Sequence, residues 1–321
     1  MVKILINDGI HPDGQLLLEE AGYQVETNKI AQEDLEAQLP NYDAICVRSA
    51  TKVRTALIDK CPNLKAICRG GVGLDNIDVK YAREKGIQVI NTPAASSKSV
   101  AELAFGHMFN LSRFLHQSNR DMPAKGNSEF KKLKKGYSKG QELRGKKLGI
   151  IGFGRIGQET AKIGLGLGMT VLPVDLMLDD ATIQLSFQGS KEITVSIKVD
   201  TVEMDEMLAK ADYISLHVPS LGKALLGKAE MEKMKDGVIL VNTARGGTID
   251  EDALLAALES GKVGGAGLDV FENEPTPRAD LLNHPRISVS PHIGASTQEA
   301  QRNIGLELAE KLINLFGEQS S

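Results

Sequence analysis

The segment KLGIIGFGRIGQETAKIGLGLGMTVLPVD, Lys147–Asp175, decides the fold of this chain. Apolar residues at 148–151 lead into the glycine turn Gly152–Gly157. A helix-like stretch then connects this turn to a second apolar run, Met169–Val174, which ends at Asp175. Strand, glycine turn, helix, strand and acidic residue follow in the order of the dinucleotide-binding fingerprint G-x-G-x-x-G. The segment therefore predicts a Rossmann-type α/β unit that binds a dinucleotide.

The residues of the glycine turn have separate physical tasks. Gly152 permits the tight turn, and Gly154 lets the backbone approach a pyrophosphate closely. Gly157 allows the helix to pack against the first strand, while N–H groups around Arg155 and Ile156 face the phosphate charge. We expect these five residues to bind the cofactor.

Asp175 predicts which dinucleotide binds. Its carboxylate can accept hydrogen bonds from the adenosine ribose hydroxyls, and it would repel a 2′-phosphate. Neither Leu176 nor Met177 offers a cation that could compensate this repulsion. The sequence therefore predicts NAD, rather than NADP, as the cofactor.

The composition is that of an ordinary globular protein. The chain has 321 residues, of which 41% are hydrophobic and 25% charged, and its net charge is −4. This charge gives no general reason to bind nucleic acid or an anionic membrane, and no apolar run approaches the ~20 residues of a spanning helix. No signal-peptide layout is present, and the cysteines Cys46, Cys61 and Cys68 form neither a disulfide framework nor a metal-binding spacing. We expect a cytoplasmic protein with reduced thiols and no metal.

Strand-like and helix-like patterns alternate along almost the whole chain, which is typical of doubly wound parallel sheets. A first unit of about a hundred residues has predicted strands at Lys3–Ile6, Ala44–Val47, Ala66–Cys68 and Ile87–Ile90. A second unit contains the glycine turn and further predicted strands at Tyr213–Val218, Val238–Val241 and Ile287–Val289. Two capping-box patterns, at Ser99–Glu102 and Ser296–Glu299, predict the starts of helices that continue to Leu115 and Leu315.

Two segments depart from this alternation. Pro123–Gly140 is polar and rich in lysine, which favours a solvated surface loop. Thr182–Phe187 and Glu192–Val199 alternate apolar and polar residues around Gln188-Gly189-Ser190, which predicts a β-hairpin inserted at 179–200. This insertion is either a surface decoration, which we favour, or a flap or subunit contact beside the adenosine end of the cofactor.

Several motifs besides the glycine turn follow one another in a fixed order. They are Asn91-Thr92-Pro93, Ser99–Glu102, VNTARGG at Val241–Gly247, GLDVFENEP at Gly267–Pro275 and PHIGAS at Pro291–Ser296. In these motifs the chain resembles the D-isomer-specific 2-hydroxyacid dehydrogenases over almost its whole length. The resemblance implies two Rossmann-like domains with a cleft between them. An NAD-binding domain over 99–294 would be inserted into a substrate domain made of 1–98 and 295–321.

The chemistry of such an enzyme indicates the catalytic residues. Oxidising a 2-hydroxy acid requires a hydride acceptor, a base for the hydroxyl proton and a cation for the carboxylate and developing carbonyl. His292 is the expected base, because it follows a strand end within a family motif. Arg245 is expected to bind the carboxylate and polarise the C2 oxygen. Glu274, by resemblance, hydrogen-bonds His292 and favours its charged form. Structural roles are the alternatives for all three.

The resemblance also implies further contacts. Asp269 would face the nicotinamide end of the cofactor. Other cofactor contacts are implied for His217, Val218, Pro219, Thr243, Ala244 and Gly294. Substrate contacts are implied for segments after two strands of the first unit, at Arg48, Ser49, Arg69, Gly71, Val72 and Gly73. The remaining histidines, without an expected role, are His11, His107, His116 and His284.

The segments at 47–53 and 69–78 are most similar to the 3-phosphoglycerate dehydrogenase branch of the family. Arg48 and Arg69 could bind a substrate phosphate, or they could form structural ion pairs. In that branch, basic residues before the NAD domain reach the neighbouring subunit's substrate, which makes the lysines at 131–135 candidates. A homodimer formed by the helix at Ser99–Leu115 and this basic segment is implied.

We therefore expect NAD-dependent oxidation of D-3-phosphoglycerate to 3-phosphohydroxypyruvate, the entry to serine biosynthesis. The sequence ends at Ser321, shortly after the last predicted helix, so we expect no C-terminal regulatory domain and no serine feedback through one. The alternatives are a hydroxypyruvate/glyoxylate reductase, a D-lactate dehydrogenase, or an NAD-sensing scaffold similar to the transcriptional corepressors of this fold. The two extra arginines favour the first function.

Overall fold

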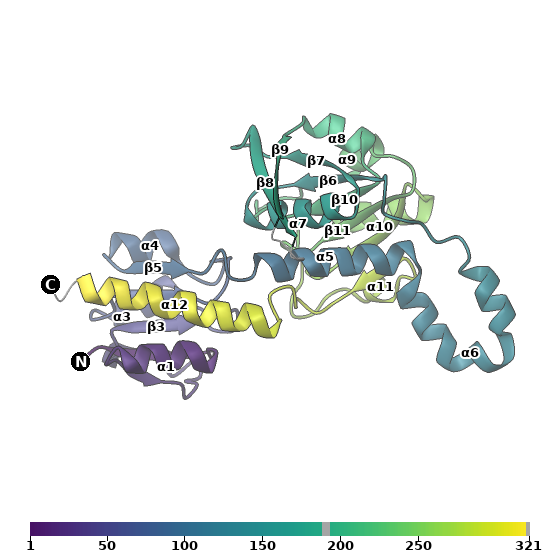
Figure 1. The fold of residues 1–321 in the computed structure, drawn as a ribbon. Coiled ribbons are helices and arrows are strands. Elements are labelled where there is room, and N and C mark those ends of the chain that lie inside the picture. The colour runs from purple at the N-terminus through teal and green to yellow at the C-terminus, as the bar shows by residue number, and fades with distance from the viewer. Residues whose placement is uncertain (188–192, 319–321) are drawn as a thin grey trace. The chain divides into compact units, whose positions relative to one another are not determined.

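A computed structural model describes residues 1–187 and 193–318 of the chain (Figure 1). The chain divides into a terminal unit, Met1–Ser97 with Ala295–Ser321, and a central unit, Lys98–Gly294. The first division lies one residue before the expected boundary. Each unit has a parallel sheet with helices packed on both faces, which confirms the predicted α/β fold.

The terminal unit has a five-stranded sheet in the order β2-β1-β3-β4-β5. Its strands are β1 (Lys3–Ile6), β2 (Gln24–Glu26), β3 (Ala44–Val47), β4 (Ala66–Arg69) and β5 (Gln88–Asn91). Its helices are α1 (Pro12–Glu20), α2 (Leu35–Gln38), the 3-10 helix η1 (Leu39–Asn41), α3 (Thr55–Lys60), α4 (Val79–Glu84) and α12 (Gln298–Glu318). Ile4 and Ile6 pack with α1 and α12, whereas Leu5 packs on the other face with α2 to α4, because successive strand residues point to opposite faces.

The central unit has a six-stranded sheet in the order β13-β12-β11-β10-β6-β7. Its strands are β6 (Lys147–Ile151), β7 (Thr170–Val174), β10 (Tyr213–Leu216), β11 (Val238–Asn242), β12 (Val263–Leu268) and β13 (Ile287–Val289). Its helices are α5 (Ser97–Ser112), α6 (Leu115–Gly136), α7 (Arg155–Gly166), α8 (Met204–Lys210), α9 (Lys228–Lys233), α10 (Glu251–Ser260) and α11 (Ala279–Asn283). Leu148 and Ile150 pack with α5 and α7, and Ile151 packs on the opposite face with α8 to α11.

An antiparallel pair of strands, β8 (Asp180–Phe187) and β9 (Ile193–Asp200), occupies the segment where we expected a hairpin. The expected turn, Gln188-Gly189-Ser190, lies outside the described residues. Ile183 and Val199 are buried in the same apolar cluster as residues of α5 and α7. These two strands are therefore packed onto the central unit.

The expectation of a loop over Pro123–Gly140 was wrong, because α6 continues through it to Gly136. Figure 1 shows α6 as an arm that projects from the rest of the central unit. Lysine and glutamate are good helix formers, so a polar segment can be helical without a core. Lys125 pairs with Asp121 at 2.9 Å. The backbone leaves helical geometry at Glu129 (φ −121°, ψ 22°).

Both capping predictions need correction. α5 begins at Ser97, and the Ser99 hydroxyl donates to the carbonyl oxygen of Gly294 at 2.6 Å instead of capping a helix. At α12 the cap is Thr297, one residue later than expected, since its Oγ1 accepts from the N–H of Ala300 at 3.1 Å. A serine beside a threonine does not reveal which hydroxyl will cap.

The three cysteines are free and buried. Among the helices of residues 1–187 and 193–318, none combines the length and the apolar character that crossing a membrane requires.

Candidate active site

The turn between β6 and α7 is shaped by two glycines that have no room for a side chain. Gly152 has a φ of +93°, and a Cβ there would lie 2.8 Å from the carbonyl oxygen of His217. A Cβ on Gly157 would lie 2.1 Å from the carbonyl oxygen of Gly152, so glycine lets α7 begin close to β6. Gly154 faces open space, and none of the described side chains caps α7, so the first N–H groups of this helix remain for a ligand. This arrangement fits a bound pyrophosphate.

Asp175 follows β7 and lies beside the glycine turn. Its Oδ2 accepts from the N–H of Phe153 at 2.7 Å, and its Oδ1 accepts from the N–H of Met177 at 2.8 Å. Each carboxylate oxygen has a second lone pair, so these bonds orient the group and leave capacity for ribose hydroxyls. The side chain of Leu176 is almost fully exposed, and no cation follows to receive a 2′-phosphate.

Two buried polar atoms at the carboxyl edge of the sheet have no hydrogen-bond partner among the described residues. His217 Nε2 lies 3.0 Å from the hydroxyls of Thr160 and Ser215, but its Nδ1 has no partner among the described residues. Thr243 Oγ1, which follows the neighbouring strand β11, also has no partner among the described residues. Burial lowers the pKa of His217 to about 3, so its ring is neutral. Unsatisfied buried polar atoms are costly, and a polar ligand such as NAD would satisfy them. Val218, Pro219 and Ala244 lie at this edge too.

Arg245 lies on the turn after β11, and Asn242 organises this turn. Asn242 Nδ2 donates to the carbonyl oxygen of Arg245 and to Thr248 Oγ1, both at 2.9 Å. Its Oδ1 accepts from the N–H of Ala244 at 3.1 Å. One amide side chain therefore holds the turn from both sides. The Arg245 guanidinium also donates to the carbonyl oxygen of Ala244 at 2.6 Å.

His292 and Glu274 form a close pair, with 2.7 Å between His292 Nδ1 and Glu274 Oε2. The N–H of Phe271 donates to Glu274 Oε1 at 3.0 Å and fixes the carboxylate. The hydrogen bond from Glu274 raises the pKa of His292, although burial opposes this. Burial also pushes the pKa of Glu274 upward, but the hydrogen bonds from His292 and Phe271 outweigh it and the pKa is lowered. Because Nδ1 is engaged, Nε2 is the nitrogen that can exchange a proton with a ligand.

Arg245 lies near this pair. Hydrogen bonding and burial have the larger effects on the pKa values of Glu274 and His292. The positive charge of Arg245 has a smaller effect and lowers both pKa values. The structure thus brings the three expected catalytic residues together within the central unit.

Gly246 is the point where the Arg245 turn meets the turn that leads to Glu274. A Cβ on Gly246 would lie 1.9 Å from the carbonyl oxygen of Phe271, which is backbone and cannot yield cheaply. We expect Gly246→Ala to lower kcat/KM by about 10²-fold through misplacement of both turns, and to destabilise the fold by about 1–3 kcal/mol. Steady-state kinetics and thermal unfolding would measure these effects. Gly166→Ala is the matched control, because a Cβ there meets nothing within 4 Å. Equal kinetics in the two variants would contradict the expectation.

Asp269 holds the backbone beside His292. Its carboxylate accepts from the N–H of Ile293 and of Gly294, both at 2.9 Å, and from the Ser290 hydroxyl at 2.6 Å. Its own carbonyl oxygen accepts from the N–H of His292 at 2.8 Å. Asp269 and Gly294, both expected to contact the cofactor, are thus bonded to each other.

In the terminal unit, side chains of Asp8 and Asn76 bind the backbone of the segment after β3. Asp8 Oδ2 accepts from the N–H of Arg48 at 2.7 Å and of Thr51 at 3.0 Å, and Asn76 Nδ2 donates to the carbonyl oxygen of Arg48 at 2.7 Å. Across residues 1–187 and 193–318, the Arg48 guanidinium has no hydrogen bond or ion pair. Ser49 beside it is exposed.

The backbone N–H of Gly71 lies in the second segment expected to contact the substrate. This N–H donates to Thr92 Oγ1 at 2.8 Å and is therefore already used. Gly71 has a φ of +139°, and a Cβ there would lie 1.8 Å from Arg69 Nη1, so the Arg69 guanidinium folds over this glycine. Within the described parts of the chain, the N–H groups of Val72 and Gly73 have no acceptor and remain available.

Sequence reasoning assigned no role to Asn242, Gly246 or Ser290, although these residues shape the site. Asn242 and Gly246 lie inside the VNTARGG motif, and Ser290 directly precedes PHIGAS. Their position beside the expected catalytic residues was the available signal. Their hydrogen bonds and close contacts depend on segments that meet only in the fold.

Residues 105–294 match the family model for the NAD-binding domain of D-isomer-specific 2-hydroxyacid dehydrogenases. The chain is 44% identical to a hydroxypyruvate reductase from Thermotoga maritima, and the alignment covers 98% of each chain. It is 42% identical to a D-3-phosphoglycerate dehydrogenase from Archaeoglobus fulgidus over 98% of this chain, but spans only 57% of that protein.

Among solved structures, a glyoxylate reductase from Paecilomyes thermophila is similar. It superposes with a TM-score of 0.80 at 30% identity, and the match covers 97% of this chain and 94% of that one. The fingerprint, the cluster of arginine, glutamate and histidine, and these similarities have one explanation. The chain belongs to the D-isomer-specific 2-hydroxyacid dehydrogenase family and is an NAD-dependent oxidoreductase.

Proposed function

We propose that this enzyme oxidises D-3-phosphoglycerate to 3-phosphohydroxypyruvate. The observation that carries the substrate assignment is the Arg48 guanidinium, which has no acceptor in residues 1–187 and 193–318 although Asp8 and Asn76 bind the backbone around it. A planar guanidinium with five donors, on a backbone that is anchored by hydrogen bonds, suits a phosphate. Arg69 lies in the second segment assigned to the substrate, folded over Gly71.

The central unit would perform the chemistry. NAD, when bound at the glycine turn and Asp175, supplies the acceptor for the hydride that leaves C2. His292 Nε2 takes the hydroxyl proton, while Glu274 holds Nδ1 and stabilises the imidazolium that forms. The Arg245 guanidinium binds the substrate carboxylate and polarises the C2 oxygen. In the reverse direction the protonated His292 returns the proton.

A second function, reduction of hydroxypyruvate, is favoured by the Thermotoga maritima relative, which carries that name and matches this chain over nearly its full length. D-3-phosphoglycerate differs by one phosphate from D-glycerate, the hydroxy acid that corresponds to hydroxypyruvate. Comparing D-3-phosphoglycerate with D-glycerate in NADH formation, and the two corresponding ketoacids in NADH consumption, decides between them. A higher kcat/KM for the phosphorylated compounds supports the proposal, and equal or higher values for the others reject it.

Arg48→Gln extends this comparison. We expect it to raise KM for D-3-phosphoglycerate by about 10- to 100-fold, because a charge-assisted hydrogen bond contributes about 1.5–3 kcal/mol. The KM for D-glycerate should change by less than about threefold, since no phosphate is lost. Equal loss on both substrates would show that Arg48 does not recognise a phosphate.

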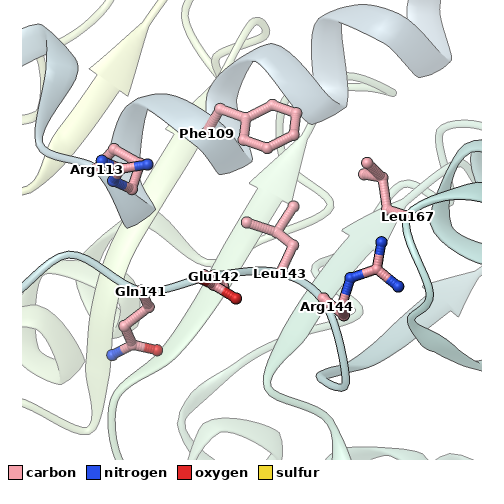
Figure 2. Close-up of a pocket in the computed structure, with 7 residues that line it drawn as sticks. All are labelled: Phe109, Arg113, Gln141, Glu142, Leu143, Arg144 and Leu167. Carbon is pink, nitrogen blue, oxygen red and sulfur yellow. The ribbon is translucent and has the colours of Figure 1, made fainter.

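We also propose that the enzyme is a homodimer formed by α5 and α6. Apolar side chains are exposed along these helices, with exposed fractions of 39% at Phe109, 49% at Leu115 and 56% at Phe130. Beside α5, a pocket of about 220 Å³ opens between Phe109, Arg113 and the loop at 141–144 (Figure 2). The exposed apolar side chains and the pocket suit contact with helix α6 of a second copy of the chain.

Sedimentation equilibrium is expected to give twice the chain mass of 34.6 kDa. Phe130→Glu should weaken the dimer by at least about tenfold, because it places a charge on an apolar contact. Leu16→Glu, at a half-exposed leucine on α1, is the control. A monomer at micromolar concentration would refute this assembly.

A further inference from the structure

His107 is a buried histidine to which the mechanism above gives no role. It lies on α5, is 3% exposed, and has hydroxyl partners on both ring nitrogens. Nδ1 is 2.9 Å from Ser288 Oγ, and Nε2 is 3.0 Å from Ser290 Oγ. On β12, Gly267 provides the space, because a Cβ there would lie 2.5 Å from His107 Cβ. The fold therefore makes room for this ring between α5 and the segment at 288–290.

The directions of these hydrogen bonds follow from the Asp269 carboxylate. An ionised carboxylate only accepts, so the Ser290 hydroxyl donates to Asp269 Oδ1, at 2.6 Å. Ser290 Oγ must then accept from the N–H at His107 Nε2. Nδ1 of the neutral ring accepts in turn from the Ser288 hydroxyl. Burial lowers the pKa of His107, against the raising effect of the Asp269 charge, while His116 lowers it further. A neutral ring agrees with this assignment.

This chain of bonds ends at the turn that carries His292. Asp269 binds the N–H groups of Ile293 and Gly294, and its carbonyl oxygen binds the N–H of His292. His292 has a φ of +54°, in the left-handed region that side chains other than glycine rarely adopt. Such a conformation is energetically unfavourable and persists only when the surroundings enforce it. Here the hydrogen bonds from three backbone N–H groups to Asp269 enforce this conformation of His292.

We propose that His107 is a positioning residue: through Ser290 it holds the Asp269 carboxylate that keeps the turn at His292 in its active conformation. This inference rests on the proposed role of His292 as the acid/base. It explains why a polar ring, rather than an apolar side chain, fills the space over Gly267. Ser288, on the other nitrogen, lies off the path to Asp269.

Two pairs of variants test the proposal. In each pair, one variant breaks the hydrogen-bonded path from His107 through Ser290 to Asp269, and the other leaves it intact. Ser290→Ala breaks it and Ser288→Ala does not. His107→Asn keeps an amide near the Nδ1 position and loses the donor to Ser290, whereas His107→Gln keeps a donor near the Nε2 position. We expect Ser290→Ala and His107→Asn each to lower kcat by about 10- to 100-fold. His107→Gln and Ser288→Ala should stay within about threefold. The double variant His107→Asn/Ser290→Ala should match Ser290→Ala.

A second readout does not depend on turnover. The imidazole resonance of His292, identified by its loss in His292→Gln, is titrated by NMR in each variant. In the wild type Glu274 and Asp269 raise the pKa above the usual 6.5, opposed by burial and Arg245. A loosened turn weakens the bond to Glu274, so Ser290→Ala and His107→Asn should shift this pKa back toward 6.5.

The proposal is overturned if this pKa is unchanged or higher in Ser290→Ala, or if His107→Gln loses as much activity as His107→Asn. The latter result would show that His107 only fills space. Should the wild type turn over no 2-hydroxy acid, the proposed function fails, while the titration still reports on the path from His107 to His292.

Discussion

Replacing His292 with glutamine is expected to lower kcat by roughly 10²- to 10⁴-fold in both directions, the usual contribution of a positioned acid/base. Glutamine keeps a polar group near the ring position but cannot accept and release the proton. The hydrogen bond between His292 Nδ1 and Glu274, at 2.7 Å, orients the ring. The expected loss of kcat therefore comes from the missing proton transfer at Nε2. Rapid-mixing and steady-state kinetics with the preferred hydroxy acid measure the effect.

The affinity for NAD is the internal control for this variant. It should stay within about twofold, because the cofactor is held by the glycine turn and Asp175 rather than by His292. His11→Asn is the matched control, since asparagine preserves the cap that His11 provides to α1. A His292→Gln enzyme that keeps more than about a tenth of the wild-type kcat would remove His292 from the mechanism.

The same assignment fixes the pH dependence of the wild type. Glu274 raises the pKa of His292, against burial, above the usual 6.5. Oxidation needs the neutral ring, so its kcat/KM should rise with pH through this raised value. Reduction needs the protonated ring, so its kcat/KM should fall over the same range. These changes of kcat/KM with pH should be absent in His292→Gln.

Arg245→Lys is expected to lower kcat/KM for the hydroxy acid by roughly 10²- to 10³-fold, the cost of losing one well-placed donor to a developing oxyanion. Lysine retains the charge but cannot form two parallel hydrogen bonds to a carboxylate. The turn should survive, because Asn242 holds it through the backbone of Arg245 and Ala244. The measurement is kcat and KM on the same substrate, with circular dichroism to confirm folding.

Arg83→Lys, at an exposed arginine on α4, is the control and should leave both constants unchanged. A retained kcat/KM in Arg245→Lys would show that a point charge suffices at this position, and would assign carboxylate binding to other donors. The N–H groups of Val72 and Gly73, which have no acceptor within the described residues, are the next candidates.

Features that depend on near neighbours in the chain were predictable. The glycine turn, its flanking strands and Asp175 all lie within Lys147–Asp175, so their steric and electrostatic tasks could be assigned from order alone. The strands Lys3–Ile6 and Ala44–Val47 have the predicted bounds, because a run of apolar residues suits a strand covered on both faces. The cluster of Arg245, Glu274 and His292 was expected from motifs rather than from spacing.

Predictions made from local polarity were the ones that failed. Lysines suit a helix as well as a loop, so composition could not distinguish α6 from a solvated loop over Pro123–Gly140. The pattern at Ser99–Glu102 matches a capping box, yet the Ser99 hydroxyl bonds to Gly294, 195 residues away. The partner of the Gly71 N–H, Thr92 Oγ1, likewise lies 21 residues away.

The sequence by itself determined the α/β units and the NAD fingerprint, because periodicity and turn sterics are properties of adjacent residues. Only the tertiary structure decided which polar atoms are already paired and which remain for ligands. It showed that Gly246 touches the backbone at Phe271 and that His107 is linked to Asp269 through Ser290. Such pairings form between segments far apart in the chain, so their partners exist only after the sheet has assembled.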